Sequence, residues 1–197
     1  MNYAKLKTIK KLYFGYDEIA GALGIDPASA RVSANRYVRQ GFLVRLKRNI
    51  YVLRQRWETL SQEEIFRLAN LIQVPSYISL MTALGYYEIT TQIQRNFVES
   101  IAVKRTKEAD VAGTTFRFTK INKNLYSGFV RKNGFFIASA EKAFLDAVYL
   151  MSLKRYGLDL TSIDFGKLDP AKLKAMAKVY PKKTRKALEK YGYFKKT

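Results

Sequence analysis

The chain has 197 residues, 48% of them hydrophobic, which is enough to bury the core of one large domain or two small ones. It has no cysteine or histidine, which excludes disulfides, zinc–thiolate sites, thiol catalysis and histidine general bases. Its 36 Lys+Arg against 16 Asp+Glu give a net charge of +20, which favours a nucleic-acid partner over an anionic membrane surface. The N-terminus lacks a signal-peptide core, and no apolar run reaches the roughly 20 residues of a membrane span. We therefore expect a cytoplasmic protein that does not contact a membrane.

Positive charge is concentrated at the two ends of the chain. Residues 1–56 hold 12 basic and 3 acidic residues, a net +9, and residues 161–197 hold 11 and 3, a net +8. Residues 57–160 hold 13 and 10, a net +3. Because the charge is grouped rather than spread evenly, both ends are candidate polyanion-binding regions.

Three helices and a hairpin are predicted in the first basic region. The helices cover residues 3–11, 16–23 and 27 to about 40, and the strands cover residues 42–46 and 49–53. Gly24 is typical of a helix C-terminus, Asp26 of an N-cap, and Pro27 of a first helical position. The predicted order is helix, tight turn, capped helix and hairpin.

The third predicted helix has an apolar side and a polar side. At about 100° per residue, the apolar side collects Ala30, Ala34, Tyr37 and Val38. The polar side collects Ser29, Val32, Asn35, Arg36 and Arg39. A helix in the major groove of DNA needs small and polar residues near its start and longer cations near its end. Val32 suits a thymine methyl group, Asn35 can pair with adenine, and Arg36 can pair with guanine.

The hairpin has a basic tip, formed by Arg45, Lys47, Arg48 and Asn49. Such a tip lies along DNA phosphates or in the minor groove, where it adds affinity and salt dependence more than sequence choice. Together these elements predict a winged helix-turn-helix DNA-binding domain over residues 1–58. The alternative is a three-helix core with a solvated basic face.

Residues 59–197 are predicted to form an α/β domain. Ser61 and Glu64 match a capping box that starts a helix to about residue 72, and Ser139 caps an apolar helix to about residue 153. The other expected elements are a helix at 77–86, strands at 97–104 and 114–121, one or two strands within 126–138, and helices near 170–179 and 182–190. The predicted fold class is α+β, with a small, mostly antiparallel sheet and C-terminal helices.

No catalytic or metal-binding constellation is predicted. Ser139 and Lys142 match the Ser-x-x-Lys spacing of serine acylating enzymes, but the partner motifs of those enzymes are missing. A helix N-cap, followed by contacts of Glu141, Lys142 and Asp146 on one helix face, explains these residues better. Asp159, Asp164 and Asp169 are spaced too widely for a metal site. We therefore expect no enzyme activity, no metal and no cofactor.

Three segments carry recognisable motifs. They are Arg39-Gln-Gly-Phe-Leu-Val-Arg-Leu-Lys-Arg-Asn-Ile-Tyr51, Tyr77-Ile-Ser-Leu-Met-Thr-Ala-Leu-Gly-Tyr86 and Ile137-Ala-Ser-Ala-Glu-Lys-Ala-Phe-Leu-Asp146. Together they resemble the AbiEi-type antitoxins of bacterial and archaeal type IV toxin–antitoxin systems, first known from phage abortive infection, and the resemblance covers most of the chain. This chain has Asn49-Ile50 where the family usually has glycine before the aromatic residue. Asparagine tolerates left-handed backbone geometry, so the departure is mild.

The resemblance implies two activities. The protein would bind inverted repeats in double-stranded operator DNA and repress its own operon. Its second domain, residues 59–197, would counter a partner toxin of the nucleotidyltransferase-like fold without forming a stable complex with it. We expect a monomer or a weak dimer. From the residues alone, Ala83, Leu84, Ala143, Phe144 and Ala147 in the second and third motifs are interpreted as helix-packing residues.

The second basic region contains a lysine stripe. Lys182, Lys186 and Lys190 follow one another at helical spacing, and Lys174 and Lys178 extend the row. The stripe is either a solvated helix face or a second DNA contact.

Two further functions remain open from the sequence. One is a winged-helix transcriptional regulator whose C-terminal domain senses a ligand or a protein and which has no toxin partner. The other is a basic adaptor that binds RNA or anionic lipid. Aromatic residues available to an RNA-binding adaptor for base stacking are Tyr126, Phe129, Phe135 and Phe136, although core packing is their commoner use.

Overall fold

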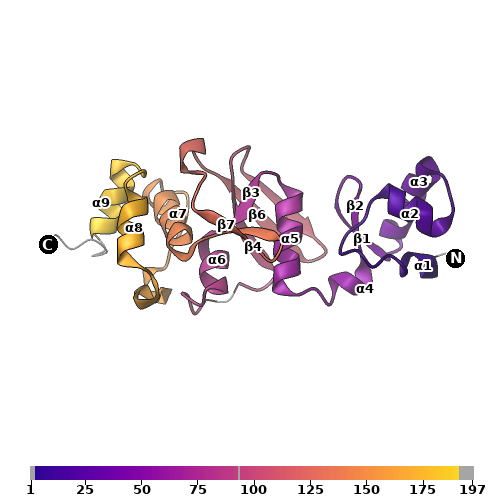
Figure 1. The fold of residues 1–197 in the computed structure, drawn as a ribbon, viewed down its shortest axis with the longest axis horizontal. Helices are drawn as coiled ribbons and strands as arrows, with labels where there is room; N and C mark the ends of the chain where they lie inside the picture. The colour runs from indigo at the N-terminus through magenta and orange to yellow at the C-terminus, as the bar shows by residue number, and fades with distance from the viewer. Residues whose placement is uncertain (1–2, 93, 191–197) are drawn as a thin grey trace. The chain divides into compact units, whose positions relative to one another are not determined.

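The computed structural model describes residues 3–92 and 94–190, and within them the chain is mixed α+β (Figure 1). The chain divides into two compact units between Leu68 and Ala69. We expected the boundary between residues 58 and 59, whereas the observed division lies within helix α5 (Gln62–Ile72). Helix α4 (Arg54–Trp57) therefore lies in the first unit, where Arg56 forms an ion pair with Glu64 of α5.

The first unit begins with three helices followed by an antiparallel hairpin, and α4 and most of α5 come after them. The helices are α1 (Tyr3–Leu6), α2 (Tyr16–Leu23) and α3 (Pro27–Arg39), and the strands are β1 (Leu43–Lys47) and β2 (Ile50–Leu53). Helix α1 is shorter than the predicted 3–11, so that prediction was wrong at its C-terminal end. The chain leaves the helix after Leu6 and extends, because Phe14 pairs with Tyr51 of β2 through two backbone hydrogen bonds of 3.0 and 2.9 Å.

Local signals in the turn between α2 and α3 are confirmed. Gly24 has φ 69° and ψ 41°, the left-handed conformation that ends α2. The Asp26 side chain accepts a hydrogen bond from the Ser29 N–H, and Pro27 opens α3. The apolar sides of the helices and the hairpin then enclose one core, which includes Leu6, Phe14, Ile19, Leu23, Ala30, Ala34, Tyr37, Leu43 and Tyr51.

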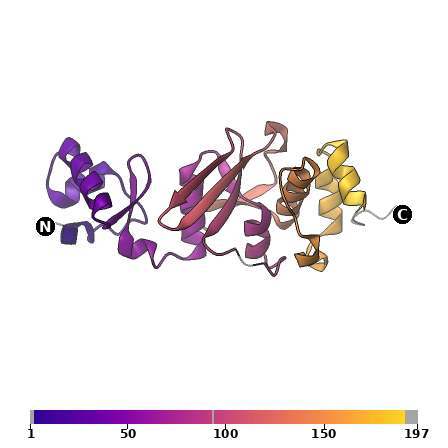
Figure 2. The same cartoon turned by 180° about the vertical axis from the view of Figure 1, so that it is seen from behind.

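The second unit is built on a six-stranded mixed sheet (Figures 1 and 2). Its strands are β3 (Ser76–Ile78), β4 (Phe97–Ala102), β5 (Lys107–Val111), β6 (Thr114–Lys120), β7 (Phe129–Lys132) and β8 (Phe135–Ala138), in the order β5-β6-β4-β3-β8-β7. The pairs β5–β6, β3–β4 and β7–β8 are antiparallel, and the pairs β4–β6 and β3–β8 are parallel. The sheet is larger and more mixed than the small, mostly antiparallel sheet that we predicted.

Helix α7 (Ala140–Ser152) is buried along most of its length. The helices packed against it are α6 (Leu80–Tyr86), α8 (Pro170–Ala177) and α9 (Lys182–Lys190). Short 3₁₀ helices cover Lys123–Leu125, Leu160–Ser162 and Phe165–Lys167. Helix α7 contacts α6, α8 and α9, and Figure 2 shows it between the sheet and the two C-terminal helices. The packing residues Ala83, Leu84, Ala143, Phe144 and Ala147 are all fully buried, as predicted.

Two predictions for the second unit were wrong. Residues 77–86 do not form one helix, because Tyr77 and Ile78 lie in β3 and α6 begins after Ser79. Strand β5 was missed, because its polar sequence becomes a strand only by pairing with β6. None of the helices in the described residues is long and apolar enough to cross a membrane.

Candidate nucleic-acid interface

Helix α3 presents an exposed side on which every charged residue is an arginine. Val32 is 69% exposed, Ser29, Arg36 and Arg39 are exposed, and Asn35 is half-buried. The helix itself contains no acidic residue. The predicted inward residues Ala30, Ala34 and Tyr37 are buried, and Val38 is half-buried. The division of α3 into two sides is therefore as predicted.

Two of the predicted contact residues also have partners within the unit. The Ser29 hydroxyl donates to Asp26 at 2.6 Å, so Ser29 takes part in the cap, and these hydrogen bonds lower the pKa of Asp26. The Arg36 guanidinium lies 5.4 Å from the centre of the Tyr37 ring. Because Tyr37 is buried, this contact positions the guanidinium group of the exposed Arg36 side chain.

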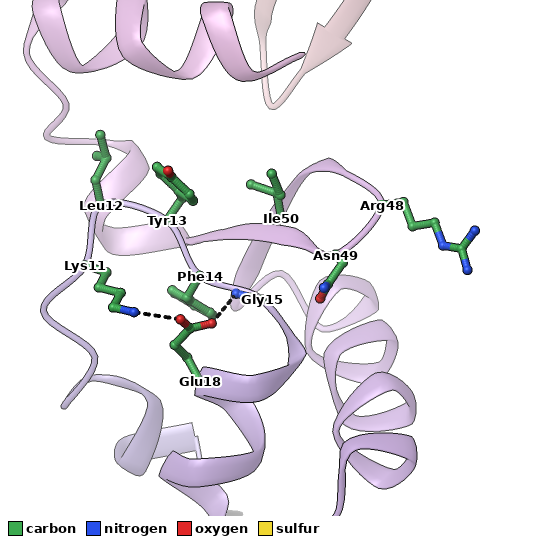
Figure 3. Close-up of a pocket in the computed structure, with 9 residues that line it drawn as sticks. All are labelled: Lys11, Leu12, Tyr13, Phe14, Gly15, Glu18, Arg48, Asn49 and Ile50. Atoms are coloured by element: carbon green, nitrogen blue, oxygen red, sulfur yellow. Dashed lines mark hydrogen bonds and ion pairs between the residues drawn. The ribbon is translucent and has the colours of Figure 1, made fainter. Parts of the chain in front are cut away.

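The hairpin tip is fixed to α2 through Asn49. This residue has φ 57°, and its side-chain oxygen accepts a hydrogen bond from the Tyr16 N–H at 2.6 Å. Gly15 permits this approach, since a Cβ atom there would lie 2.9 Å from the Asn49 oxygen. Asn49, predicted as a DNA contact, thus anchors the turn. Arg48, by contrast, is exposed and extends away from the hairpin tip (Figure 3).

An open pocket of about 780 Å³ lies between the α1–α2 connection and the hairpin (Figure 3). Its polar lining includes Lys11 and Glu18, whose charged groups are 2.7 Å apart. Hydrogen bonds from Lys11 and from the Gly15 N–H lower the pKa of Glu18. Leu12, Tyr13 and Ile50 supply apolar lining. Because the Lys11 charge is matched by Glu18, this part of the pocket does not favour an anion.

The sequence interpretation missed Arg31, Tyr16 and Tyr51. Arg31 is exposed on α3, and the same helical projection places it about 40° from Asn35, so periodicity alone could have identified it. Tyr51 donates a hydrogen bond to the Tyr16 hydroxyl, with 3.3 Å between the oxygens. No local signal indicates this pair, because the two tyrosines are 35 residues apart.

The remaining predicted cations lie on the hairpin and on α8 and α9. Arg45 is exposed and Lys47 is half-buried, next to a register shift in β1. The predicted lysine stripe, Lys174, Lys178, Lys182, Lys186 and Lys190, is exposed throughout. Thr184 and Leu188 form the buried side of α9, so the lysines occupy the opposite, solvent-facing side.

Polar residues of the second and third motifs meet in a buried network. The Lys142 ammonium contacts the Asp146 carboxylate at 2.5 Å and also donates to the Leu125 carbonyl and the Tyr180 hydroxyl. Asp146 accepts further hydrogen bonds, each 2.9 Å long, from the hydroxyl groups of Tyr77, Ser79 and Tyr180. Burial lowers the pKa of Lys142, and Asp146 opposes that shift. The predicted (i, i+4) contact is therefore present, but it is buried.

A second buried acid, Glu99 in β4, is surrounded by neutral hydrogen-bond donors. Its carboxylate accepts hydrogen bonds from the Tyr156 hydroxyl at 2.9 Å and from the Gln94 amide at 3.1 Å. Burial raises its pKa, and these hydrogen bonds oppose the rise. Like the Lys142–Asp146 network, this cluster joins distant segments of the second unit.

The aromatic residues considered for base stacking mostly pack inward. Phe135 is fully buried, and Tyr126 and Phe129 are half-buried against Tyr77, with ring centres 5.1 and 4.6 Å from it. Only Phe136 of the four is exposed, at 42%. This packing gives no stacking platform and favours core packing over RNA recognition by these side chains.

Residues 3–92 and 94–190 contain no group of three or more acidic side chains placed to hold a metal ion. No protein-family model matches the chain, and a search of curated proteins finds no match either.

Proposed function

We propose that the protein is a transcriptional regulator that binds double-stranded DNA through a winged helix-turn-helix in its first unit. The observation that carries this proposal is the exposed side of α3, where Arg36 and Arg39 flank the apolar Val32 without any acidic residue. The element order supports it: a short pairing at Phe14 precedes α2 and α3, and the β1–β2 hairpin follows.

Each part has a separate role in the proposal. Helix α3 enters the major groove, where Val32, Asn35 and Arg36 meet base edges. The hairpin follows the phosphate backbone with Arg45, Lys47 and Arg48, and Asn49 holds its tip in place. Affinity then comes mainly from the hairpin and the arginines, and sequence choice comes from α3.

A gel-shift assay with DNA from upstream of the gene tests this division. Arg36→Ala should cost about 1–3 kcal/mol of binding free energy and relax specificity at one base pair. Arg48→Ala should weaken binding to all sequences about equally and reduce the salt dependence. The matched control is Arg105→Ala, which removes an exposed arginine from the second unit. If both test variants bind like the control, DNA recognition has been assigned to the wrong surface.

We further propose, from the resemblance of its three motifs to the AbiEi-type antitoxins, that the protein represses its own operon and counters a nucleotidyltransferase-like toxin. If an adjacent gene encodes such a toxin, co-expression of this protein should restore the growth of cells that express the toxin. If no adjacent gene encodes such a protein, or if growth is not restored, the alternative hypothesis is favoured. In that hypothesis the protein is a transcriptional regulator whose C-terminal domain senses a ligand or a protein. The DNA-binding proposal does not depend on that result.

A further inference from the structure

The six-stranded sheet of the second unit has two edge strands of opposite charge. Strand β5 forms one edge and β7 the other, and no strand of the described residues pairs with their outer sides. In β5, Glu108 and Asp110 are exposed and Lys107 is half-buried. In β7, Arg131 and Lys132 are exposed. Because the outer backbone groups of an edge strand are unpaired, such a strand is a template for a strand of another chain.

The hairpin turns determine which backbone groups face the open edges. Ala112-Gly113 connects β5 to β6 and Asn133-Gly134 connects β7 to β8, and all four residues have φ between 46° and 87°. In a two-residue turn of this kind the flanking residues form a hydrogen-bonded pair, and such pairs alternate with non-bonded pairs along the strands. The backbone N–H and C=O groups of Glu108, Asp110 and Arg131 therefore point away from the hairpin partner.

The charged side chains of the two edges lie on the same face of the sheet. The cross-strand registers, followed from β7 to β5, place Arg131 on the face that carries Glu108 and Asp110. The three antiparallel pairs along this path make β5 and β7 run in opposite directions. A second copy that continues the sheet therefore brings its β5 antiparallel to β7 of the first copy, with Arg131 opposite Glu108 or Asp110.

These edges retain charge that a second copy can match. Arg131 and Asp110 form no ion pair with any residue in the described part of the chain. One Asp110 oxygen accepts a hydrogen bond from the Thr115 hydroxyl at 2.6 Å, which leaves the carboxylate charge unmatched. Pairing of two like edges would place like charges opposite one another, whereas pairing of β7 with β5 places Arg131 beside acids. Charge complementarity therefore favours unlike edges.

We propose that copies of this chain associate head to tail through their second units, with β7 of one copy pairing with β5 of the next. Because the two surfaces differ, each pair leaves one edge of either kind free, so the oligomers grow beyond a dimer. The net charge of +20 opposes association at low salt. Salt at about 150 mM screens charges beyond about 8 Å and leaves the short-range contact of Arg131 with the acids. The proposal concerns the second unit and does not depend on DNA binding.

Sedimentation velocity of the full chain over about 10–300 µM protein in about 150 mM salt tests this pairing. The average sedimentation coefficient of the wild type should rise by about half as dimers and longer series form. Arg131→Glu and Asp110→Lys should each weaken association about tenfold, because each brings like charges together. An equimolar mixture of the two variants should associate again, since the reversed edge of one then faces the reversed edge of the other.

A second pair of variants separates the backbone from the charge. Arg131→Ala removes only the charge, whereas Arg131→Pro also removes the outward N–H without removing a hydrogen bond to β8. The proline variant should therefore associate more weakly than the alanine variant. Equal association of these two variants would contradict backbone pairing at this edge.

The control is Arg155→Glu, which makes the same change in net charge on an exposed residue outside the sheet and should associate like the wild type. A wild-type sedimentation coefficient that stays constant with concentration would overturn the proposal. So would a wild-type dimer that does not grow. The same conclusion follows if the charge-reversed mixture stays monomeric although both variants have the circular dichroism of the folded wild type.

Discussion

Two groups of charged side chains, one in each unit, are used in opposite ways. In the first unit, Arg31, Arg36 and Arg45 are exposed, and α3 has no carboxylate of its own. In the second unit, Lys142 and Asp146 are at most 2% exposed and satisfy each other together with neighbouring hydroxyl groups. Unmatched charge at a surface favours a charged partner, whereas matched charge in a core fixes how segments pack.

This difference changes how the motifs of the second unit are understood. Tyr77 and Ser79 come from one motif and Lys142 and Asp146 from another, and all four meet in one buried network. Their hydroxyl, ammonium and carboxylate groups form hydrogen bonds with one another inside the unit. A motif of this kind indicates a shared fold before it indicates a shared activity, so any partner of the second unit has to contact other residues.

The largest effect is expected from breaking the buried network. Asp146→Ala leaves the Lys142 ammonium buried without its counter-charge, which should lower the free energy of unfolding by about 3–5 kcal/mol. Urea denaturation measures the loss. Glu108→Ala is the control: it breaks the exposed pair with Arg117 and should cost about 1 kcal/mol or less.

A second result sharpens this prediction. The double variant Lys142→Met/Asp146→Leu removes both charges and should regain part of the lost stability. Wild-type stability for Asp146→Ala would contradict the structural role that we assign to the network.

Substitution of the hairpin anchor is expected to have an intermediate effect. Asn49→Ala loses the hydrogen bond to the Tyr16 N–H and places an alanine at φ 57°, so it should lower the free energy of unfolding by about 1–2 kcal/mol. Asn49→Gly loses the same hydrogen bond but accepts the backbone conformation. Thermal unfolding of the two variants separates these causes, and equal stability of both would show that the left-handed geometry is unimportant.

The smallest effect is expected from the part of the lysine stripe that lies on α9. If the stripe is a second DNA contact, Lys182→Gln/Lys186→Gln should make the salt slope of DNA binding shallower by about 1–2 units while leaving stability unchanged. Truncation after Asp169 is a poor alternative, because it removes Tyr180, which hydrogen-bonds to Asp146, and the buried Leu188. An unchanged slope would identify the stripe as a solvated helix face.

Local signals allowed much of the helical structure to be predicted. Gly24, Asp26 and Ser139 mark helix ends through contacts within a few residues, and the Ser61–Glu64 capping box is present as predicted. The sides of α3 also followed from periodicity. Each of these features depends on spacing along one helix, which a sequence displays directly.

Features that depend on distant pairing could not be predicted in this way. Tyr77 lies in a strand because β4 and β8 flank it, and its hydroxyl meets Asp146 from 69 residues away. At the candidate interface, the Tyr16–Tyr51 pair and the Asn49 anchor join residues 35 and 33 positions apart. The helix that carries the site was therefore predictable, whereas the contacts that fix the hairpin beside it were not.

Hydrogen exchange of the full chain, with and without a DNA duplex from upstream of the gene, tests the central claim most directly. We predict that DNA slows exchange in α3 and in the β1–β2 hairpin, because these are the elements that we propose to contact the duplex. We also predict little change in β3 and α7, where the charged groups are already paired internally. Slower exchange confined to the second unit, or no change between residues 26 and 53, would contradict the assignment of DNA binding to the first unit.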